Sequence, residues 1–506
     1  MKVFPDYFLD LITNSKVAMQ LKSKALYILL VISFLFQLTK IDVSLNENNS
    51  FRQSQTVMLV REFLRNGFDP SSPLPIFGMQ SKVPFEFPIF QFLASIVASV
   101  SNSDPISSTR FVGVISFQVS AVLVYLLTCR WVNRKSAIFA LVVFQFSPYG
   151  LQWGHSALME FSAVAFILGA LYSTEKLIDS YVLHRKIIFS VILIGLLTLG
   201  ALTKITTFIA LLPLFLIPSL KSGFLIEKAG RVARLSIAIS VFVFVFLISF
   251  RWNSFADTVK SENKFSSKLM SQQLTVWNFG ELSDRLDPTR WYQIINTYWG
   301  PIIGGTAGLF LVISLSIFLN KNMINSILIL AIFTGPLLFI NLYWVHDYYS
   351  IAVFVPIIML AASTFSYLLS ISQTLSISHV KIFAIVSLSL MISASTSVYG
   401  KDYLAHQFKF LHEIPALSKT IAANSAPSDG VIFLECDWNP LIPYYADRKG
   451  LMLPPWGFEL EKKDMSEMKY LALCSKPGAE STEYIRQIRN LGFNLERVFS
   501  DFYLIK

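Results

Sequence analysis

Long apolar runs recur along most of this chain, and they constrain its fold more than any other feature. Each run has roughly 17 to 22 residues, enough to cross a ~30 Å hydrocarbon core as a helix. Only 15% of the residues are charged and 54% are hydrophobic, whereas a soluble domain carries about a quarter charged residues. We therefore predict a polytopic α-helical membrane protein.

The apolar runs predict about eleven transmembrane helices. They lie at about 25–41, 110–129, 137–152, 157–174, 187–203, 205–218, 234–250, 301–319, 324–342, 350–371 and 380–397. A further apolar piece at 87–100 is too short for a span and is expected to re-enter the membrane or lie flat on it. These spans form a transmembrane domain over residues 1–399, whose first outer loop covers 42–109.

The positive charges predict the orientation of these spans. Lys2, Lys16, Lys22 and Lys24 precede the first run, and alternation of the spans places the other short basic loops on the same side. Cytoplasmic loops carry such an excess of Lys and Arg, so the net charge of +10 reflects topology. We expect a multi-pass protein of the inner (plasma) membrane with a cytoplasmic N-terminus. Nucleic acid is not an expected partner, because no basic run with interleaved aromatics lies on a soluble module.

The last hundred or so residues change character and predict a small extracytoplasmic α/β domain at 400–506. Strand-like runs alternate there with helical stretches, at Gly430–Glu435, Leu451–Leu453, Tyr470–Cys474 and Val498–Ile505 for the strands, and at Tyr403–Ala423 and Thr482–Leu491 for the helices. Cys436 and Cys474 fall in this region, and an oxidising compartment would allow them to pair. Their spacing alone leaves the pairing open.

Most residues capable of chemistry gather on the predicted outer face. The most polar stretch between the first two apolar runs is Leu45–Gln91, and its segment Thr56–Asn66 has the apolar spacing of a short interfacial helix that stops at Gly67. The outer segments supply Glu47, Arg52, Gln53, Gln55 and Glu86, then His155 and Glu160, Lys204, Trp277, Asn278, Asp284 and Arg285, His346, Asp347, Tyr348 and Tyr349, and finally Asp437, Trp438 and Arg448.

Burying an ionisable side chain near the hydrocarbon costs free energy, which singles out some of these residues. Others can be explained by an ordinary structural role. Glu160 lies at the head of an apolar run and Lys204 lies between two short spans, and an ionisable group near the hydrocarbon marks a functional site by default. Asp284 and Arg285 suit a solvated loop equally well, and His346 with Asp347 suits an interfacial aromatic belt. Carboxylates, cations and aromatic rings on one outer face favour glycosyl transfer from a lipid carrier.

Several short motifs follow one another in a recognisable order. They are Phe51–Thr56, Val83–Pro88, Glu160 at the head of the fourth span, Lys204–Thr207, Trp277–Gly280 and Asn341–Tyr349, with Asp437–Asn439 and Tyr444–Arg448 in the tail. In this order they resemble motifs of bacterial GT-C glycosyltransferases. These are integral-membrane enzymes related to the aminoarabinose transferases of lipid A and to protein O-mannosyltransferases.

The resemblance implies an inverting transfer of a sugar from a polyprenyl-phosphate donor. The acceptor would be an envelope glycan, lipid or protein at the extracytoplasmic face. The family plan places an acidic base in the first outer loop and a second acid at the next outer turn. Glu47 and Glu86 are the candidates for the first position, and Glu160 suits the second. Relatives often have Asp or Glu within a few residues of the Arg-Gln pair, whereas in this chain Asn49 and Ser50 precede Phe51.

The resemblance also suggests which residues bind the substrate. We expect Arg52, Lys204 and His346 to contact the carrier phosphate. Gln53, Gln55, Asp347 and Tyr349 complete the predicted substrate site. Some superfamily members bind a divalent metal, but no acidic pair stands beside the Arg-Gln motif, so neither a metal nor another cofactor is expected to be required.

Two other functions share this topology. A lipid-linked glycan transporter or flippase would place charged groups along a path through the membrane, often in inverted repeats. Here few charges fall within a span, and no such repeat is visible. A glycan polymerase would depend on a large arginine-rich outer loop, whereas the outer arginines of this chain are spread. We therefore favour the transferase.

Overall fold

The computed structural model describes residues 24–221 except 48, 231–318 except 304, 322–374, and 413–506 except 454–456, 477 and 500, together with 397 and 401. The predicted span at 380–397, apart from its last residue, lies outside these residues. So do Lys2, Lys16, Lys22 and the first ten residues of the helix predicted at 403–423.

The first three quarters of the described chain is helical. The helices before residue 262 are α3 (Lys24–Leu38), α4 (Ser50–Asn66), α5 (Ile89–Ser101), α6 (Pro105–Trp131), α7 (Arg134–Phe146), α8 (Pro148–Trp153), α9 (Glu160–Asp179), α10 (Leu183–Thr203), α11 (Ile205–Leu211), η1 (Leu212–Phe215), α12 (Leu216–Lys221) and α13 (Arg231–Ser261). Those that follow are η2 (Ser266–Leu269), α14 (Thr275–Phe279), α15 (Leu282–Leu286), α16 (Pro288–Gln293), η3 (Ile294–Trp299), η4 (Gly300–Ile302), α17 (Thr306–Phe318), α18 (Met323–Leu338), α19 (Ile340–Val345), η5 (Asp347–Ser350) and α20 (Ile351–Thr374).

Five helical segments of the described chain are long and apolar enough to cross a membrane, or six if one pair bent by 87° counts as a broken span. Several predicted spans are instead shorter helices. The run predicted at 137–152 divides at Ser147, because the hydroxyl of Ser147 accepts from the N–H of Gly150 and Pro148 starts the next helix, α8. The count of eleven stays a prediction.

The interior of the bundle is built on aromatic side chains. The Phe117 ring of α6 lies 5.0 Å from the rings of both Phe144 and Phe161, which belong to α7 and α9. Phe354 of α20 lies 4.7 Å from Phe144. Such buried rings contribute a large apolar area and pack in preferred edge or offset geometries. The bundle therefore holds the first turn of α9, where the site begins, on a rigid support.

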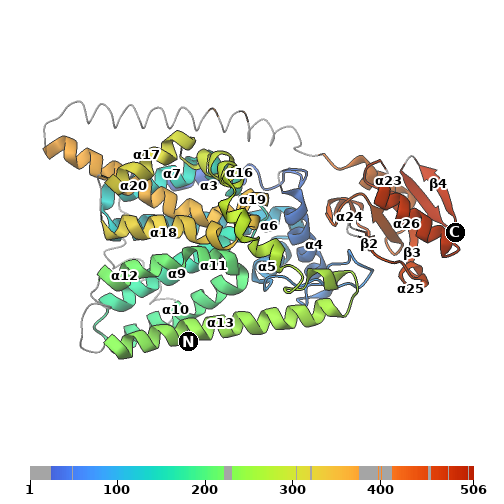
Figure 1. Ribbon diagram of the computed structural model, residues 1–506, viewed down its shortest axis with the longest axis horizontal. Helices are drawn as coiled ribbons and strands as arrows, with labels where there is room; N and C mark the ends of the chain where they lie inside the picture. Colours follow the sequence, from blue (N-terminus) through green and yellow to red (C-terminus); the bar gives the residue numbers. More distant parts are fainter. Residues whose placement is uncertain are drawn as a thin grey trace.

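The C-terminal part contains a five-stranded sheet, which lies at one end of the molecule with α4 between it and the helices (Figure 1). Its strand order is β2-β1-β3-β5-β4; β1 runs parallel to β2 and β3, and β5 runs antiparallel to β3 and β4. The strands are β1 (Gly430–Leu434), β2 (Gly450–Met452), β3 (Met468–Leu473), β4 (Leu495–Phe499) and β5 (Phe502–Ile505), and the helices are α23 (Ala416–Asn424), α24 (Leu441–Ala446), α25 (Lys462–Met465) and α26 (Ala479–Asn490).

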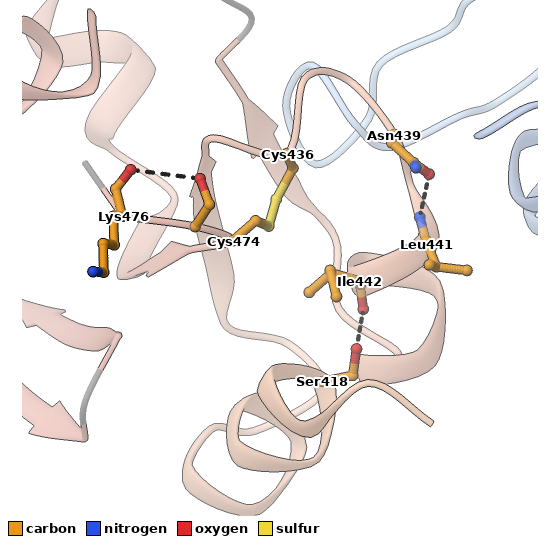
Figure 2. The surroundings of a disulfide bond; sticks show 8 residues. Ser418, Cys436, Asn439, Leu441, Ile442, Cys474 and Lys476 are labelled. Carbon is orange, nitrogen blue, oxygen red and sulfur yellow. Dashed lines mark hydrogen bonds between the residues drawn. A yellow bond between two sulfur atoms is a disulfide. The ribbon is translucent and has the colours of Figure 1, made fainter. Parts of the chain in front are cut away.

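A disulfide joins Cys436 and Cys474, with their Cα atoms 5.2 Å apart. Cys436 follows β1 and Cys474 follows β3, so the bond ties together the ends of two neighbouring parallel strands (Figure 2). The pairing that the spacing left open is therefore present. Disulfides of this kind persist in oxidising compartments.

The segment between α4 and α5 attaches directly to the edge of the sheet. The N–H of Gly78 donates to the carbonyl of Gly450 at 2.9 Å, and the N–H of Met452 donates to the carbonyl of Ile76 at 2.6 Å. Because edge strands present unpaired backbone groups, these bonds let the loop cover the β2 edge. The C-terminal sheet and the loop that carries Glu86 thus share one hydrogen-bonded surface.

Replacing Gly450 with Ala is expected to destabilise this junction. A Cβ atom at Gly450 would stand 1.8 Å from the carbonyl oxygen of Val431, which is backbone and cannot move aside cheaply. We expect a loss of about 1–3 kcal/mol, measured as a lower thermal midpoint and faster proteolysis of the C-terminal part. Gly195→Ala is the control, because a Cβ there meets no atom within 4 Å. Equal stability of the two variants would contradict this account of the junction.

Candidate active site

Helix α4 begins at Ser50, six residues before the predicted start at Thr56. The apolar spacing that predicts the helix starts at Val57, so it does not detect the polar residues that form the first turn. As a result Arg52, Gln53 and Gln55 are helical, and their side chains leave a rigid element instead of a loose loop.

Arg52, Glu86 and Lys204 form the centre of the site. The guanidinium of Arg52 forms an ion pair with Oε2 of Glu86, and its Nη1 donates to Oε1 of Gln55 at 3.0 Å. On the other side of the carboxylate, Nζ of Lys204 lies 2.7 Å from Oε1 of Glu86. Each carboxylate oxygen of Glu86 therefore contacts one cation.

Lys204 reaches this centre because it stands at a break between two helices. Helix α10 ends at Thr203, Lys204 is extended, and α11 starts at Ile205. The Lys204 side chain is only 4% exposed; its Nζ lies 3.2 Å from Oε1 of Glu160 and 4.8 Å from the ring centroid of Tyr349. A buried ammonium needs such partners, because desolvating an unpaired charge is expensive.

Glu160 is the least satisfied acid of the site. It is the first residue of α9 and is 1% exposed. Its contact with Lys204 is an ion pair without hydrogen-bond alignment, and within the described chain neither of its carboxylate oxygens makes a hydrogen bond. A buried carboxylate with unused lone pairs can accept a proton or a substrate donor.

Glu47 belongs to a second, adjoining group. Its Oε1 accepts from Arg110 at 2.7 Å and from Nε2 of Gln53 at 3.0 Å. Gln53 in turn accepts from the backbone N–H of Ala157, three residues before Glu160. The other oxygen of Glu47, Oε2, is buried and has no hydrogen-bond partner in the described residues. Gln53 thus connects Glu47 to the start of α9.

Arg110 is a site residue that the sequence analysis missed. Its side chain is fully buried in α6, where it also donates to the carbonyl of Lys40 at 2.9 Å. It was counted as the first residue of a predicted span. An arginine within an apolar run is itself a signal of function, and that signal would have found it.

His346 lies among aromatic rings at the edge of the site. Its ring centroid lies 5.2 Å from that of Tyr348, 6.1 Å from that of Tyr349 and 6.2 Å from that of Trp277. Burial, together with the positive charges of Lys204 and Arg52, lowers the pKa of His346 to about 4. His346 is therefore neutral at pH 7. The neighbouring Asp347 accepts from Nδ2 of Asn49 at 2.8 Å, which ties this turn to the start of α4.

Glu86 is charged under all ordinary conditions. Burial on its own would raise the pKa of this carboxyl, but the positive charges of Arg52 and Lys204 outweigh burial and lower the pKa to about 2. A carboxylate held so firmly in its ionised form is a weak proton acceptor at neutral pH.

Other residues singled out from the sequence lie elsewhere. His155 is buried against the side chain of Gln37, Asp284 pairs with Arg290, and Arg285 and Arg448 donate mainly to backbone carbonyls. These contacts explain them as structural residues. In the part of the chain that the structure describes, no three His, Cys, Asp or Glu residues are placed so that they could hold a metal ion.

Comparisons with known proteins support the sequence resemblance. A family model described as dolichyl-phosphate-mannose-protein mannosyltransferase matches residues 82–252, a segment that contains Glu86, Glu160 and Lys204. A search of curated protein sequences found no match.

Solved structures with a similar fold cover nearly the whole chain. One is ArnT from Cupriavidus metallidurans bound to undecaprenyl phosphate, with a TM-score of 0.63 and 11% identity over 95% of this chain and 97% of that one. Another is the archaeal oligosaccharyltransferase AglB from Archaeoglobus fulgidus in complex with an inhibitory peptide and a dolichol-phosphate, with a TM-score of 0.55 and 13% identity over 90% of this chain and 70% of that one.

A third similar structure is the arabinofuranosyltransferase AftD from Mycobacteria, with a TM-score of 0.51 and 12% identity over 94% of this chain and 38% of that one. At these identities the likeness concerns the fold. The recognition from the motifs is confirmed at that level: this chain has the GT-C glycosyltransferase fold, and its residues 82–252 match the protein-mannosyltransferase family.

Proposed function

We propose that this chain is an inverting glycosyltransferase that moves a sugar from a polyprenyl-phosphate donor to an envelope glycan, lipid or protein acceptor. The observation that carries the proposal is the pair of cations, the partly buried Arg52 and the buried Lys204, held on either side of Glu86. Two fixed cations in a nearly dry site are suited to stabilising the negative charge of a departing phosphate.

The proteins of similar fold support a phosphate-bearing donor. ArnT was solved with undecaprenyl phosphate and AglB with a dolichol-phosphate. For this chain we assign the carrier phosphate to Arg52 and Lys204. Nε2 of Gln55, which is buried without an acceptor in the described residues, would donate to an oxygen of the donor. The neutral ring of His346 and the ring of Tyr349 would line the same site.

The contacts separate the roles of the three acids. Both oxygens of Glu86 contact cations, so we assign Glu86 to holding Arg52 and Lys204 in place before the donor binds. Glu160 and Glu47 each keep at least one oxygen without a hydrogen-bond partner in the described chain. We therefore assign the general base to Glu160 or Glu47.

In the proposed reaction the acceptor gives its proton to this base and attacks the anomeric carbon. The bond from that carbon to the phosphate oxygen breaks, and the polyprenyl phosphate leaves with both electrons of the bond. Arg52 and Lys204 stabilise the charge that builds up on the phosphate. This stabilisation matters most in the transition state, which is the condition for raising the rate.

We propose that the site faces the extracytoplasmic side of the inner membrane. The Cys436–Cys474 disulfide supports this orientation, because such bonds form in oxidising compartments. The part of the chain that carries the disulfide also contacts the loop that carries Glu86. The disulfide and the candidate site therefore lie on the same side.

Substitution of the acids tests the assignment of the base. Glu160→Gln and Glu47→Gln, each purified and assayed with a panel of polyprenyl-phosphate sugars, are expected to differ: the variant that lacks the base loses about 10²–10⁴-fold in kcat. Glu175→Gln is the control, because this buried acid pairs with Arg130 away from the site. Near-normal turnover of both site variants would sink the assignment, and loss of turnover in the control would show that the assay reports stability.

The lowered pKa of Glu86 predicts that its ion pairs stabilise the folded chain in a pH-dependent way. The pKa of Glu86 is about 2 in the folded chain, against roughly 4.3 for an unfolded Glu. The unfolded chain therefore binds the proton first, so the contribution is complete above about pH 5 and is lost as the pH falls toward 2. Thermal midpoints of the wild type and Glu86→Gln should differ most near neutral pH and converge in acid. A difference that stays constant down to pH 3 would contradict the ion pairs.

A further inference from the structure

We propose that Trp438 and Asn439 are positioning residues for Arg52, and that the Cys436–Cys474 disulfide keeps them in place. This inference rests on the proposed role of Arg52 at the carrier phosphate. Both residues belong to the loop Glu435–Pro440, which leads from β1 to α24 in the C-terminal part of the chain. They act on Arg52 from the side of α4 that faces the sheet.

Asn439 holds the first turn of α4 through its side-chain amide. Its Oδ1 accepts from the hydroxyl of Ser54 at 3.2 Å, and its Nδ2 lies 3.4 Å from the hydroxyl of Ser50. The same Oδ1 accepts from the backbone N–H of Leu441 at the start of α24, as Figure 2 shows. One side chain therefore joins the start of α24 to the start of α4.

Trp438 reaches Arg52 through two aromatic neighbours. Its ring meets the Phe51 ring edge-on, with 4.7 Å between centroids, and lies 5.9 Å from the Phe85 ring. The guanidinium carbon of Arg52 lies 5.6 Å from the centroid of the same Phe85 ring. Phe51 immediately precedes Arg52 and Phe85 immediately precedes Glu86, so Trp438 packs against the residue next to each member of the ion pair.

Helix geometry makes these contacts relevant to Arg52. With about 100° between successive residues, Ser50, Phe51 and Ser54 share one side of α4 and Arg52 projects from the other. The usual N-cap bond is missing, because Asn49 makes no side-chain bond to the helix and instead bonds Asp347. The loop Glu435–Pro440 therefore supplies restraint that a capping side chain would otherwise give.

The disulfide fixes this loop at its start. Glu435 and Asp437, on either side of Cys436, have φ angles of 58° and 48°, in the left-handed region. Aspartate tolerates this region, but for Glu435 it costs roughly 1–2 kcal/mol, so the conformation of Glu435 persists only where the surroundings impose it. The bond from Cys436 to Cys474, at the end of β3, is the covalent part of that constraint.

A double-mutant cycle tests whether Asn439 acts through Arg52. The full-length protein in lipid nanodiscs is titrated with undecaprenyl phosphate. We expect Arg52→Ala to weaken binding about 100-fold and Asn439→Ala about tenfold, and the double variant to bind no more weakly than Arg52→Ala alone, because residues that act as one unit are not additive. Additive losses would show that Asn439 acts independently of Arg52 and would overturn the proposal.

Two further comparisons distinguish positioning from general loosening. Trp438→Ala and Cys436→Ser are each expected to weaken binding several-fold, whereas Trp438→Phe keeps an aromatic ring and should bind nearly as the wild type. Tyr470→Ala is the control, since Tyr470 stacks on Phe502 within the same sheet, away from the loop. An equal loss in Tyr470→Ala would overturn the proposal.

The outcome for Arg52→Ala alone separates this inference from the proposed function. Unchanged affinity of Arg52→Ala for undecaprenyl phosphate would contradict the role of Arg52 at the phosphate. A large loss in Arg52→Ala, with no loss in Asn439→Ala and Trp438→Ala, would leave that role standing and overturn only the positioning by the loop.

Discussion

The ion pairs of Glu86 with Arg52 and Lys204 are the interaction on which the rest of the site depends. Three charges are held close together with little access to water, and such groups are stable only when each compensates another. Removing Glu86 would leave two neighbouring cations without the carboxylate that they share. Arg52, Glu86 and Lys204 belong to α4, the loop before α5 and the break between α10 and α11. The packing of the surrounding structure brings these three segments together.

Several supports converge on this point from separate parts of the chain. The aromatic interior of the bundle fixes the start of α9 and Glu160. The loop that carries Glu86 hydrogen-bonds with the β2 edge of the C-terminal sheet, and Asn49 ties the start of α4 to the turn at Asp347. An enzyme site needs its reacting groups held within a fraction of an ångström. The C-terminal sheet is thus part of the framework of the site and not a separate appendage.

Much of the candidate site could be predicted from charged residues that interrupt apolar runs, where burying a charge costs free energy. Glu160 and Lys204 attract attention because they interrupt apolar runs, and the order of the motifs drew Arg52 and Glu86 into the same group. The contacts among them could not be predicted, since Glu86 is 118 positions away from Lys204 along the chain. Tertiary packing alone decides which acid meets which cation.

The helix boundaries were harder to predict for a related reason. Apolar periodicity marks the buried face of a helix, so a polar turn such as Ser50–Gln55 is invisible to it even though it is helical. For the same reason apolar periodicity predicted a single span at 137–152, although one helix ends at Ser147 and the next begins at Pro148. The disulfide was beyond prediction because two cysteines do not reveal the distance between their Cα atoms.

The charge balance of the site bears on how a phosphate-bearing donor would bind and react. Arg52 and Lys204 carry two positive charges, and Glu86 and Glu160 carry two negative charges when ionised, so the group is neutral as a whole. A sugar phosphodiester would add one negative charge beside these carboxylates. In the proposed reaction this charge would lie against Arg52 and Lys204, so each cation would contact the phosphate as well as Glu86. As the polyprenyl phosphate leaves, the negative charge on its oxygen would grow, and the same two cations would stabilise that charge more in the transition state than in the bound donor.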